Sequence, residues 1–133
     1  METFQILDHC ADNKIVLARE YDSPKSGNPE VTPDHIRFNG WKDEGHETFL
    51  VTRERPDPPS WDPASKESFD FCKTARKPYD LAVCLVLLSM SRHAPRSVRV
   101  GSDGDWEMEW TEARRVYKEM FGVEPKLLFK AAA

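Results

Sequence analysis

The chain has 133 residues, of which 39% are hydrophobic and 32% are charged, and its net charge is −4. This length is typical of one domain with a buried core, and this composition excludes a disordered chain. The acidic total disfavours nonspecific binding of nucleic acid, and no apolar run approaches the roughly 20 residues that a membrane span needs.

We expect a single domain over residues 1–130, and we interpret the three alanines at 131–133 as a remnant of cloning. The three cysteines, Cys10, Cys72 and Cys84, form no Cys-x-x-Cys pair. An odd number of separated cysteines argues against a disulfide framework and against a zinc site, and it suits a reducing compartment. We therefore expect a cytoplasmic protein without a metal ion or another cofactor.

The first half of the chain predicts strands. Residues 4–9 and 14–21 are predicted to pair as a hairpin around a turn signal at 11–13. The segment 23–33 contains three prolines, a glycine and an asparagine, and it is predicted as a loop.

Two further strands are predicted before the middle of the chain. Residues 35–39 alternate polar and apolar side chains, and residues 46–53 are predicted to pair with them in antiparallel orientation. A turn at 40–45 joins the two. Four prolines within residues 56–63 exclude a regular element there, so we expect a surface connection to the second half.

A helix is predicted from about residue 78 to residue 93. Pro78 suits a first helical turn, and Asp80 places a negative charge near the helix N-terminus. The segment is apolar on nearly all sides, which is typical of a central, buried helix.

The remaining elements are a short strand at 97–101, a turn at 102–105 and a helix at 106–121 with Gly122 as its C-terminal cap. The apolar stripe of this helix consists of Trp106, Trp110, Ala113, Val116, Tyr117 and Met120. The whole order indicates an α+β fold. An N-terminal antiparallel sheet of hairpins precedes an α-β-α portion with a buried central helix and a C-terminal amphipathic helix, and the helices pack on one face of the sheet.

Positive charge is concentrated in one segment. Residues 71–100 carry six lysines and arginines against a single acid, a net charge of +5, so the rest of the chain carries −9. A basic segment in an otherwise acidic protein indicates a place where an anion could bind.

The first candidate site lies just ahead of the helix at 78–93. Cations, a hydroxyl group and backbone N–H groups at a helix N-terminus favour an anion, and adjacent aromatic rings suit a nucleotide base. The candidate ligand-binding residues are Phe69, Phe71, Lys73, Thr74, Arg76, Lys77 and Tyr79. Alternatively, Phe69 and Phe71 are core residues of a short strand and the cations are solvated. Neither glycine-rich phosphate motif occurs in the sequence.

A second group of cations, Arg92, Arg96 and Arg99, lies at the other end of that helix. A 16-residue helix is about 24 Å long, so one protomer cannot easily bring both groups to one small ligand. Two protomers packed antiparallel could, and we therefore expect a homo-oligomer with the anion pocket at the subunit interface. The alternative is that these arginines are scattered over the surface.

The sequence contains no recognisable catalytic set. The four histidines have no metalloprotease or deaminase spacing. Cys72 beside Lys73 could have a lowered pKa, but an inert buried thiol is the simpler interpretation. Asp103 and Asp105 lie in a turn with too few ligands for calcium. We therefore expect a protein that is not an enzyme.

The run Phe-Asp-Phe-Cys-Lys-Thr-Ala-Arg-Lys-Pro-Tyr-Asp, the apolar helix, the run Val-Arg-Val-Gly-Ser-Asp-Gly and the Trp-rich closing helix resemble a group of small phage and prophage proteins over residues 35–122. That resemblance implies no particular activity. More loosely, the chain is similar to phage anti-Thoeris sponges, which sequester cyclic ADP-ribose-type signals without cleaving them. This similarity implies that Phe69 or Phe71 stacks on a base and that Arg96 or Arg99 holds phosphate.

We therefore expect a non-enzymatic phage-type protein that sequesters an anionic small molecule, a cyclic nucleotide defence signal, in the host cytosol. We expect no membrane and no nucleic acid among its partners. The alternative is a protein-interaction module that inhibits a host protein, with its acidic remainder facing a basic host surface. Loop tryptophans Trp41 and Trp61 could anchor it, or they could fold back over the core.

Overall fold

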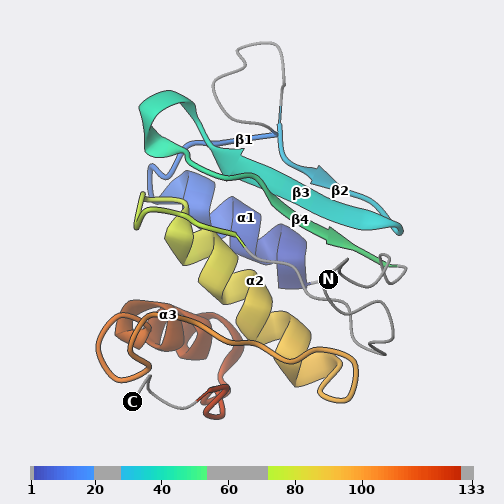
Figure 1. Cartoon of the computed structure of the whole chain (residues 1–133), viewed down its shortest axis with the longest axis vertical. Helices are drawn as coiled ribbons and strands as arrows, with labels where there is room; N and C mark the ends of the chain where they lie inside the picture. Colours follow the sequence, from blue (N-terminus) through green and yellow to red (C-terminus); the bar gives the residue numbers. More distant parts are fainter. Residues whose placement is uncertain (1, 20–27, 54–71, 130–133) are drawn as a thin grey trace, which may run out of the picture. The chain divides into compact units, whose positions relative to one another are not determined.

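The computed structural model describes residues 2–19, 28–53 and 72–129 (Figure 1). An antiparallel sheet and three helices make an α+β fold, as predicted. The chain divides into two compact units, a helical unit of residues 1–12 and 80–133 and a sheet unit of residues 13–79. The described elements are α1 (Glu2–Asp12), β1 (Leu17–Ala18), β2 (Glu30–Val31), β3 (His35–Gly40), the 3-10 helix η1 (Lys42–Glu44), β4 (Phe49–Thr52), α2 (Asp80–His93) and α3 (Thr111–Phe121).

Strand β3 organises the sheet unit, because all three other strands pair with it in antiparallel orientation. Strand β4 runs along it in the register Phe38 to Phe49, and the rings of these two residues lie 5.1 Å apart. Strand β2 pairs with the beginning of β3, and β1 pairs with its end at Gly40. The predicted strands at 35–39 and 46–53 and their antiparallel pairing are confirmed.

The N-terminal prediction for the sheet is wrong in two places. Of the described residues 14–19 in the predicted strand 14–21, Leu17–Ala18 alone form a paired strand. Within the predicted loop, Glu30–Val31 forms β2, whose turn into β3 is closed by a hydrogen bond from the Thr32 N–H to the His35 carbonyl. Strands of two residues are too short to give an alternating pattern, so local patterns could not mark their ends. The proline-rich segment 56–63 lies outside the described residues.

Residues 2–12 form a helix instead of the first strand of a hairpin. The buried residues of α1 are Thr3, Ile6 and Cys10, and this spacing of three and four residues places them on one helical face. The six-residue window at 4–9 excluded Thr3 and Cys10, so the helical period was not visible in it. The helix ends before Lys14, whose φ of 64° lies in the left-handed region.

In the helical unit, α2 contacts both α1 and α3 (Figure 1). The prediction of a buried helix at 78–93 is confirmed, with α2 beginning at Asp80. Its buried positions go all round the helix. They are Ala82, Val83, Cys84, Leu85, Val86, Leu88 and Ser89.

Helix α3 begins five residues later than predicted. The backbone carbonyl of Asp105 accepts hydrogen bonds from the N–H groups of Met108, Glu109 and Trp110, which makes a separate turn ahead of Thr111. The helix ends at Gly122 with φ 70°, so the predicted glycine cap is confirmed. The apolar stripe is also confirmed, because Trp106 and Trp110 are buried and their rings stack at 5.8 Å.

The predicted strand at 97–101 is wrong. The N–H groups of Ser97 and Val98 both donate to the carbonyl of Ala94 at 3.0 Å, so this loop closes the C-terminal end of α2. These two N–H groups are therefore bound within the loop and do not pair with a neighbouring strand. Val100 is nevertheless buried, as the alternation implied. No helix in the described ranges has the length and apolar composition to cross a bilayer.

Candidate functional site

The residues predicted to bind an anion fall into two groups. Lys73, Thr74, Arg76, Lys77 and Tyr79 belong to the sheet unit, whereas Arg96 and Arg99 belong to the helical unit. Phe69 and Phe71 lie outside the described residues. Each group is therefore treated within its own unit.

Residues 73–77, called the cationic turn from here on, form a tight reversal of the chain. The N–H of Lys77 donates to the carbonyl of Thr74 at 3.0 Å, and the two central residues, Ala75 and Arg76, have φ of 51° and 55°. Two left-handed residues in succession are typical of a type I′ turn, which asparagine and glycine favour. Alanine and arginine adopt this conformation at a cost of about 1–2 kcal/mol each. Such strain is concentrated at functional sites in proteins.

Three backbone N–H groups of the cationic turn are bound within the protein, and the helix N-terminus whose N–H groups the sequence predicted as an anion site lies further along the chain, because α2 begins at Asp80. The Lys73 N–H donates to Glu47 Oε1 at 2.8 Å, and the Arg76 N–H donates to the Thr74 hydroxyl at 3.3 Å. The Lys77 N–H is bound to Thr74 as well. An anion at this place would therefore be held by side chains. Lys73 and Arg76 are exposed, and Lys77 is partly exposed.

The connection from β3 to β4 holds the cationic turn in place. The carbonyl of Lys73 accepts hydrogen bonds from His46 Nδ1 at 2.6 Å and from the Glu47 N–H at 3.2 Å. The carbonyl of Glu47 in turn accepts the Tyr79 hydroxyl at 2.5 Å and the Cys72 thiol at 3.4 Å. Both ends of the segment 72–79 are thus bound to Glu47, and Lys73 is also bound to His46.

Tyr79 has a different role from the predicted one. Its side chain is fully buried, so it cannot offer a stacking surface to a ligand. Its hydroxyl instead bonds the Glu47 carbonyl, and it lies 3.4 Å from the Lys73 carbonyl. Buried tyrosine hydroxyl groups usually find such partners, and here the partner determines where the cationic turn lies.

The loop that carries His46 and Glu47 is itself closely packed. Asn39 is fully buried, and its side chain bonds the N–H and the carbonyl of His46, each at 3.0 Å. A Cβ atom added at Gly40 would lie 2.1 Å from the Glu44 carbonyl oxygen, and one added at Gly45 would lie 2.3 Å from the Gly40 carbonyl oxygen. Only glycine allows this approach of backbone to backbone.

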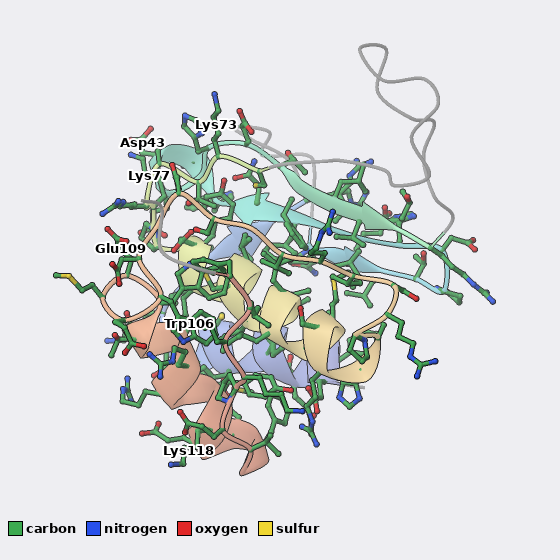
Figure 2. All side chains as sticks on the ribbon, turned by 60° about the horizontal axis from the view of Figure 1, so that its bottom comes forward. Asp43, Lys73, Lys77, Trp106, Glu109 and Lys118 are labelled. Carbon is green, nitrogen blue, oxygen red and sulfur yellow. The ribbon has the colours of Figure 1, made fainter. Side chains whose placement is uncertain are left out.

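An exposed tryptophan lies on the same loop. The Trp41 side chain is 40% exposed, and the Lys42 ammonium lies 4.1 Å from its ring centroid. In Figure 2, Asp43 of η1 lies with Lys73 and Lys77 at the end of the strands where β3 leads into η1. The sequence marked Trp41 as a loop aromatic, but the link between this loop and the cationic turn spans 27 residues and has no local pattern.

In the helical unit, Arg96 and Arg99 are exposed on the loop after α2. This loop borders a hollow of about 500 Å³. Neither arginine lines the hollow. In the sequence, however, Arg96 lies between Ala94 and Val98, which both line it. The lining residues are Glu2, Gln5, Ser89, Met90, His93, Ala94 and Val98.

One carboxylate joins the three helices beside this hollow. Glu2 Oε1 accepts the hydroxyl groups of Ser89 at 2.8 Å and Tyr117 at 2.6 Å, and Oε2 accepts Arg92 Nη1 at 3.1 Å and His93 Nε2 at 2.9 Å. These five residues are called the Glu2 cluster. Burial raises the pKa of Glu2, but hydrogen bonds from Tyr117, His93 and Ser89 outweigh burial and hold this pKa below its ordinary value.

Sequence reasoning missed the Glu2 cluster, because residues near the start were assigned to a strand. The only local signal was the spacing of Ser89, Arg92 and His93, which puts them on one face of α2. Across the described part of the chain, no group of three or more His, Cys, Asp or Glu side chains is placed to hold a metal ion.

Comparisons of the chain with protein-family models, curated proteins and solved structures found no match. Functional inference for this chain therefore rests on its own residues and their geometry.

Proposed function

We propose that the protein binds and sequesters a small anionic molecule, with a cyclic nucleotide signal as the ligand class, and that it does not turn this molecule over. One observation supports this proposal above the others. The exposed Trp41–Lys42 pair and the cationic turn are tied to the same loop of the sheet unit through His46 and Glu47.

The chemistry of this loop suits a nucleotide. A base stacked on an aromatic ring contributes about 1–3 kcal/mol, and Trp41 offers a partly exposed ring. Lys73 and Arg76 can bind phosphate oxygens through charge-assisted hydrogen bonds. Because Glu47 and Tyr79 restrain the turn, little conformational entropy remains to be lost on binding.

A second copy of the chain completes the proposed site. Arg96 and Arg99 of that copy would bind further phosphate oxygens, and Phe69 or Phe71 would stack on the base, as the similarity to sponge proteins implies. The homo-oligomer and the cytosolic location stay predictions. Light scattering with and without ligand tests the oligomer directly.

Ligand binding is tested by calorimetry and thermal shift with cyclic ADP-ribose, ADP-ribose and cyclic dinucleotides. At 100 times its Kd, a ligand stabilises the protein by about 2.7 kcal/mol. The variant Lys73→Gln/Arg76→Gln should weaken binding at least tenfold. Arg115→Gln/Lys118→Gln is the matched control, because it removes two exposed cations from α3.

Three outcomes would contradict the proposal: no ligand in the panel shifts the melting temperature, the control weakens binding as much as the test variant, or chromatography recovers cleaved ligand. Recovery of intact ligand after denaturation supports sequestration without turnover.

A second candidate function, inhibition of a host protein, is favoured by exposed apolar side chains in the helical unit. Met108 is 77% exposed and Leu127 is 61% exposed. Exposed apolar residues of this size are typical interaction anchors. If the nucleotide panel fails and Met108→Lys abolishes the biological effect of the protein while leaving its stability unchanged, this function takes precedence.

A further inference from the structure

The hollow in the helical unit shares none of its described lining residues with the proposed nucleotide site. Its volume of about 500 Å³ falls within the range of small-molecule sites in proteins. Its described lining residues come from α1, α2 and the loop after α2, which belong to the helical unit.

The walls of the hollow are of two kinds. Met90, Ala94 and Val98 provide an apolar surface, and Ser89 and His93 are among the polar groups. A ligand that fills it would therefore have a carbon body and a polar group at one end. The identity of that polar group depends on which side chains still have hydrogen-bonding capacity.

Glu2 has little capacity left. Its two oxygens accept four hydrogen bonds, from Ser89, Tyr117, Arg92 and His93, and a carboxylate has about four acceptor positions. Arg92 also balances its negative charge at 3.1 Å. An amine in the hollow would therefore find an acceptor that is already occupied, which disfavours a cationic ligand.

His93 is the lining side chain beside Glu2 that remains able to bind a ligand, and the exposed amide of Gln5 lines the same hollow. The Nε2 of His93 donates to Glu2, while 55% of the side chain is exposed. In the imidazolium form both ring nitrogens are donors, so Nδ1 can donate to an anion while Nε2 stays on Glu2. Arg96, between the lining residues Ala94 and Val98, adds positive charge to the same loop.

We propose that this hollow binds a small organic monocarboxylate, whose carboxylate accepts a hydrogen bond from His93 and whose carbon body lies against Met90, Ala94 and Val98. In its imidazolium form His93 offers one charged donor, which suits one negative charge. A phosphate dianion, so close to the Glu2 carboxylate, needs more donors than His93 supplies.

The test is an NMR titration of the full chain with phenylacetate, benzylamine, benzyl alcohol and phenyl phosphate. The affinity tag is placed at the C-terminus because Glu2 is the second residue. Phenylacetate should shift the methyl signals of Met90 and Val98 saturably, with a Kd in the millimolar range that is typical of so few atoms. Benzylamine, benzyl alcohol and phenyl phosphate should each bind at least fivefold more weakly.

His93→Gln removes the imidazole donors but keeps a polar side chain, and it should weaken phenylacetate at least fivefold while leaving benzyl alcohol unchanged. Arg115→Gln, on the exposed face of α3, is the matched control, because it also replaces an exposed basic side chain by glutamine. Val98→Phe fills the hollow and should abolish binding of all probes. If circular dichroism shows that His93→Gln is unfolded, Val98→Phe is the variant that tests binding in the hollow.

Equal binding of benzylamine and phenylacetate, unchanged phenylacetate affinity in His93→Gln, or unchanged binding in Val98→Phe would each overturn the proposal. Because this site and the cationic turn lie in different units, Lys73→Gln/Arg76→Gln should bind phenylacetate like the native chain. A failure of nucleotide binding therefore leaves this test intact.

Discussion

The cationic turn and the Glu2 cluster both gather charged side chains, but they use them in opposite ways. In the cationic turn, Lys73 and Arg76 are exposed on a strained backbone, which hydrogen bonds from His46 and to Glu47 restrain. In the Glu2 cluster, the carboxylate is only 16% exposed and its bonds run to side chains from two other helices.

In our proposal the cationic turn serves nucleotide binding, whereas the Glu2 carboxylate serves stability. A charge that is matched inside the protein contributes to the fold, and its removal leaves partners without their hydrogen bonds. Exposed charges on a strained turn contribute little to the fold, so their placement is explained better by a ligand. Changes in the Glu2 cluster should therefore reduce stability first, and changes in the cationic turn should reduce binding first.

The largest effect is expected at the loop that supports the cationic turn. Gly45→Ala places a Cβ atom 2.3 Å from the Gly40 carbonyl oxygen, so the backbone must move, at a cost on the order of 3 kcal/mol. Urea unfolding followed by circular dichroism measures the loss. Gly101→Ala is the control, because nothing lies within 4 Å of its added Cβ, and it should be neutral. Equal stability of the two variants would show that the loop is not closely packed.

Removing the charge of the Glu2 cluster should have the next largest effect. Glu2→Gln weakens the bonds to Arg92 and His93, and the free energy of unfolding should fall by about 2 kcal/mol. Asp8→Asn, at an exposed position of the same helix, should change it by less than about 0.5 kcal/mol. If the free energy of unfolding falls by the same small amount in both variants, the Glu2 cluster does not stabilise the helical unit.

Acid should act on the same carboxylate. The pKa of Glu2 is lower in the folded chain than in the unfolded chain, where it is about 4.3. The contribution of the Glu2 carboxylate to stability is therefore complete above the unfolded pKa and is lost as the pH falls through the folded pKa. The melting temperature of the native chain should fall more steeply below about pH 4.3 than that of Glu2→Gln. Parallel pH curves for the two proteins would contradict the assignment.

The smallest effect is a gain in stability at the cationic turn. Ala75→Gly relieves a left-handed residue with φ of 51° and should stabilise the chain by about 1 kcal/mol. The same change at Ala11, an exposed residue of α1, should destabilise it by about the same amount. If the strain also holds the turn ready for its ligand, Ala75→Gly should be more stable and should bind more weakly. Tighter binding by this variant would show that the strain has no role in recognition.

Local patterns predicted those parts of the fold that local chemistry determines. A run that is apolar all round predicted the buried helix α2. The apolar spacing predicted the buried face of α3 at Ala113, Val116 and Tyr117, and Gly122 predicted the end of this helix. Strands β3 and β4 followed from alternation and an intervening turn. Each of these signals lies within a few residues of the structure that it determines.

The candidate site was predictable only in part. The concentration of cations at 73–77 and the loop position of Trp41 follow from the sequence, whereas the sequence left open whether Trp41 is exposed. The sequence did not predict that the cationic turn is hydrogen-bonded to the loop that follows Trp41, because His46 and Lys73 are 27 residues apart in the chain. The loss of Tyr79 as a stacking surface has the same origin, since its ring is buried and its hydroxyl binds Glu47, 32 residues earlier.

The sequence by itself determined the α+β class, the buried helix α2 and the position of the positive charge. Only the tertiary structure decided that the first segment is a helix, that Ser97 and Val98 close α2, and that Glu2 meets Tyr117 across 115 residues. The physical reason is the reach of the interactions. Backbone propensity and side-chain periodicity act between near neighbours, whereas a buried carboxylate takes whichever donors packing brings to it.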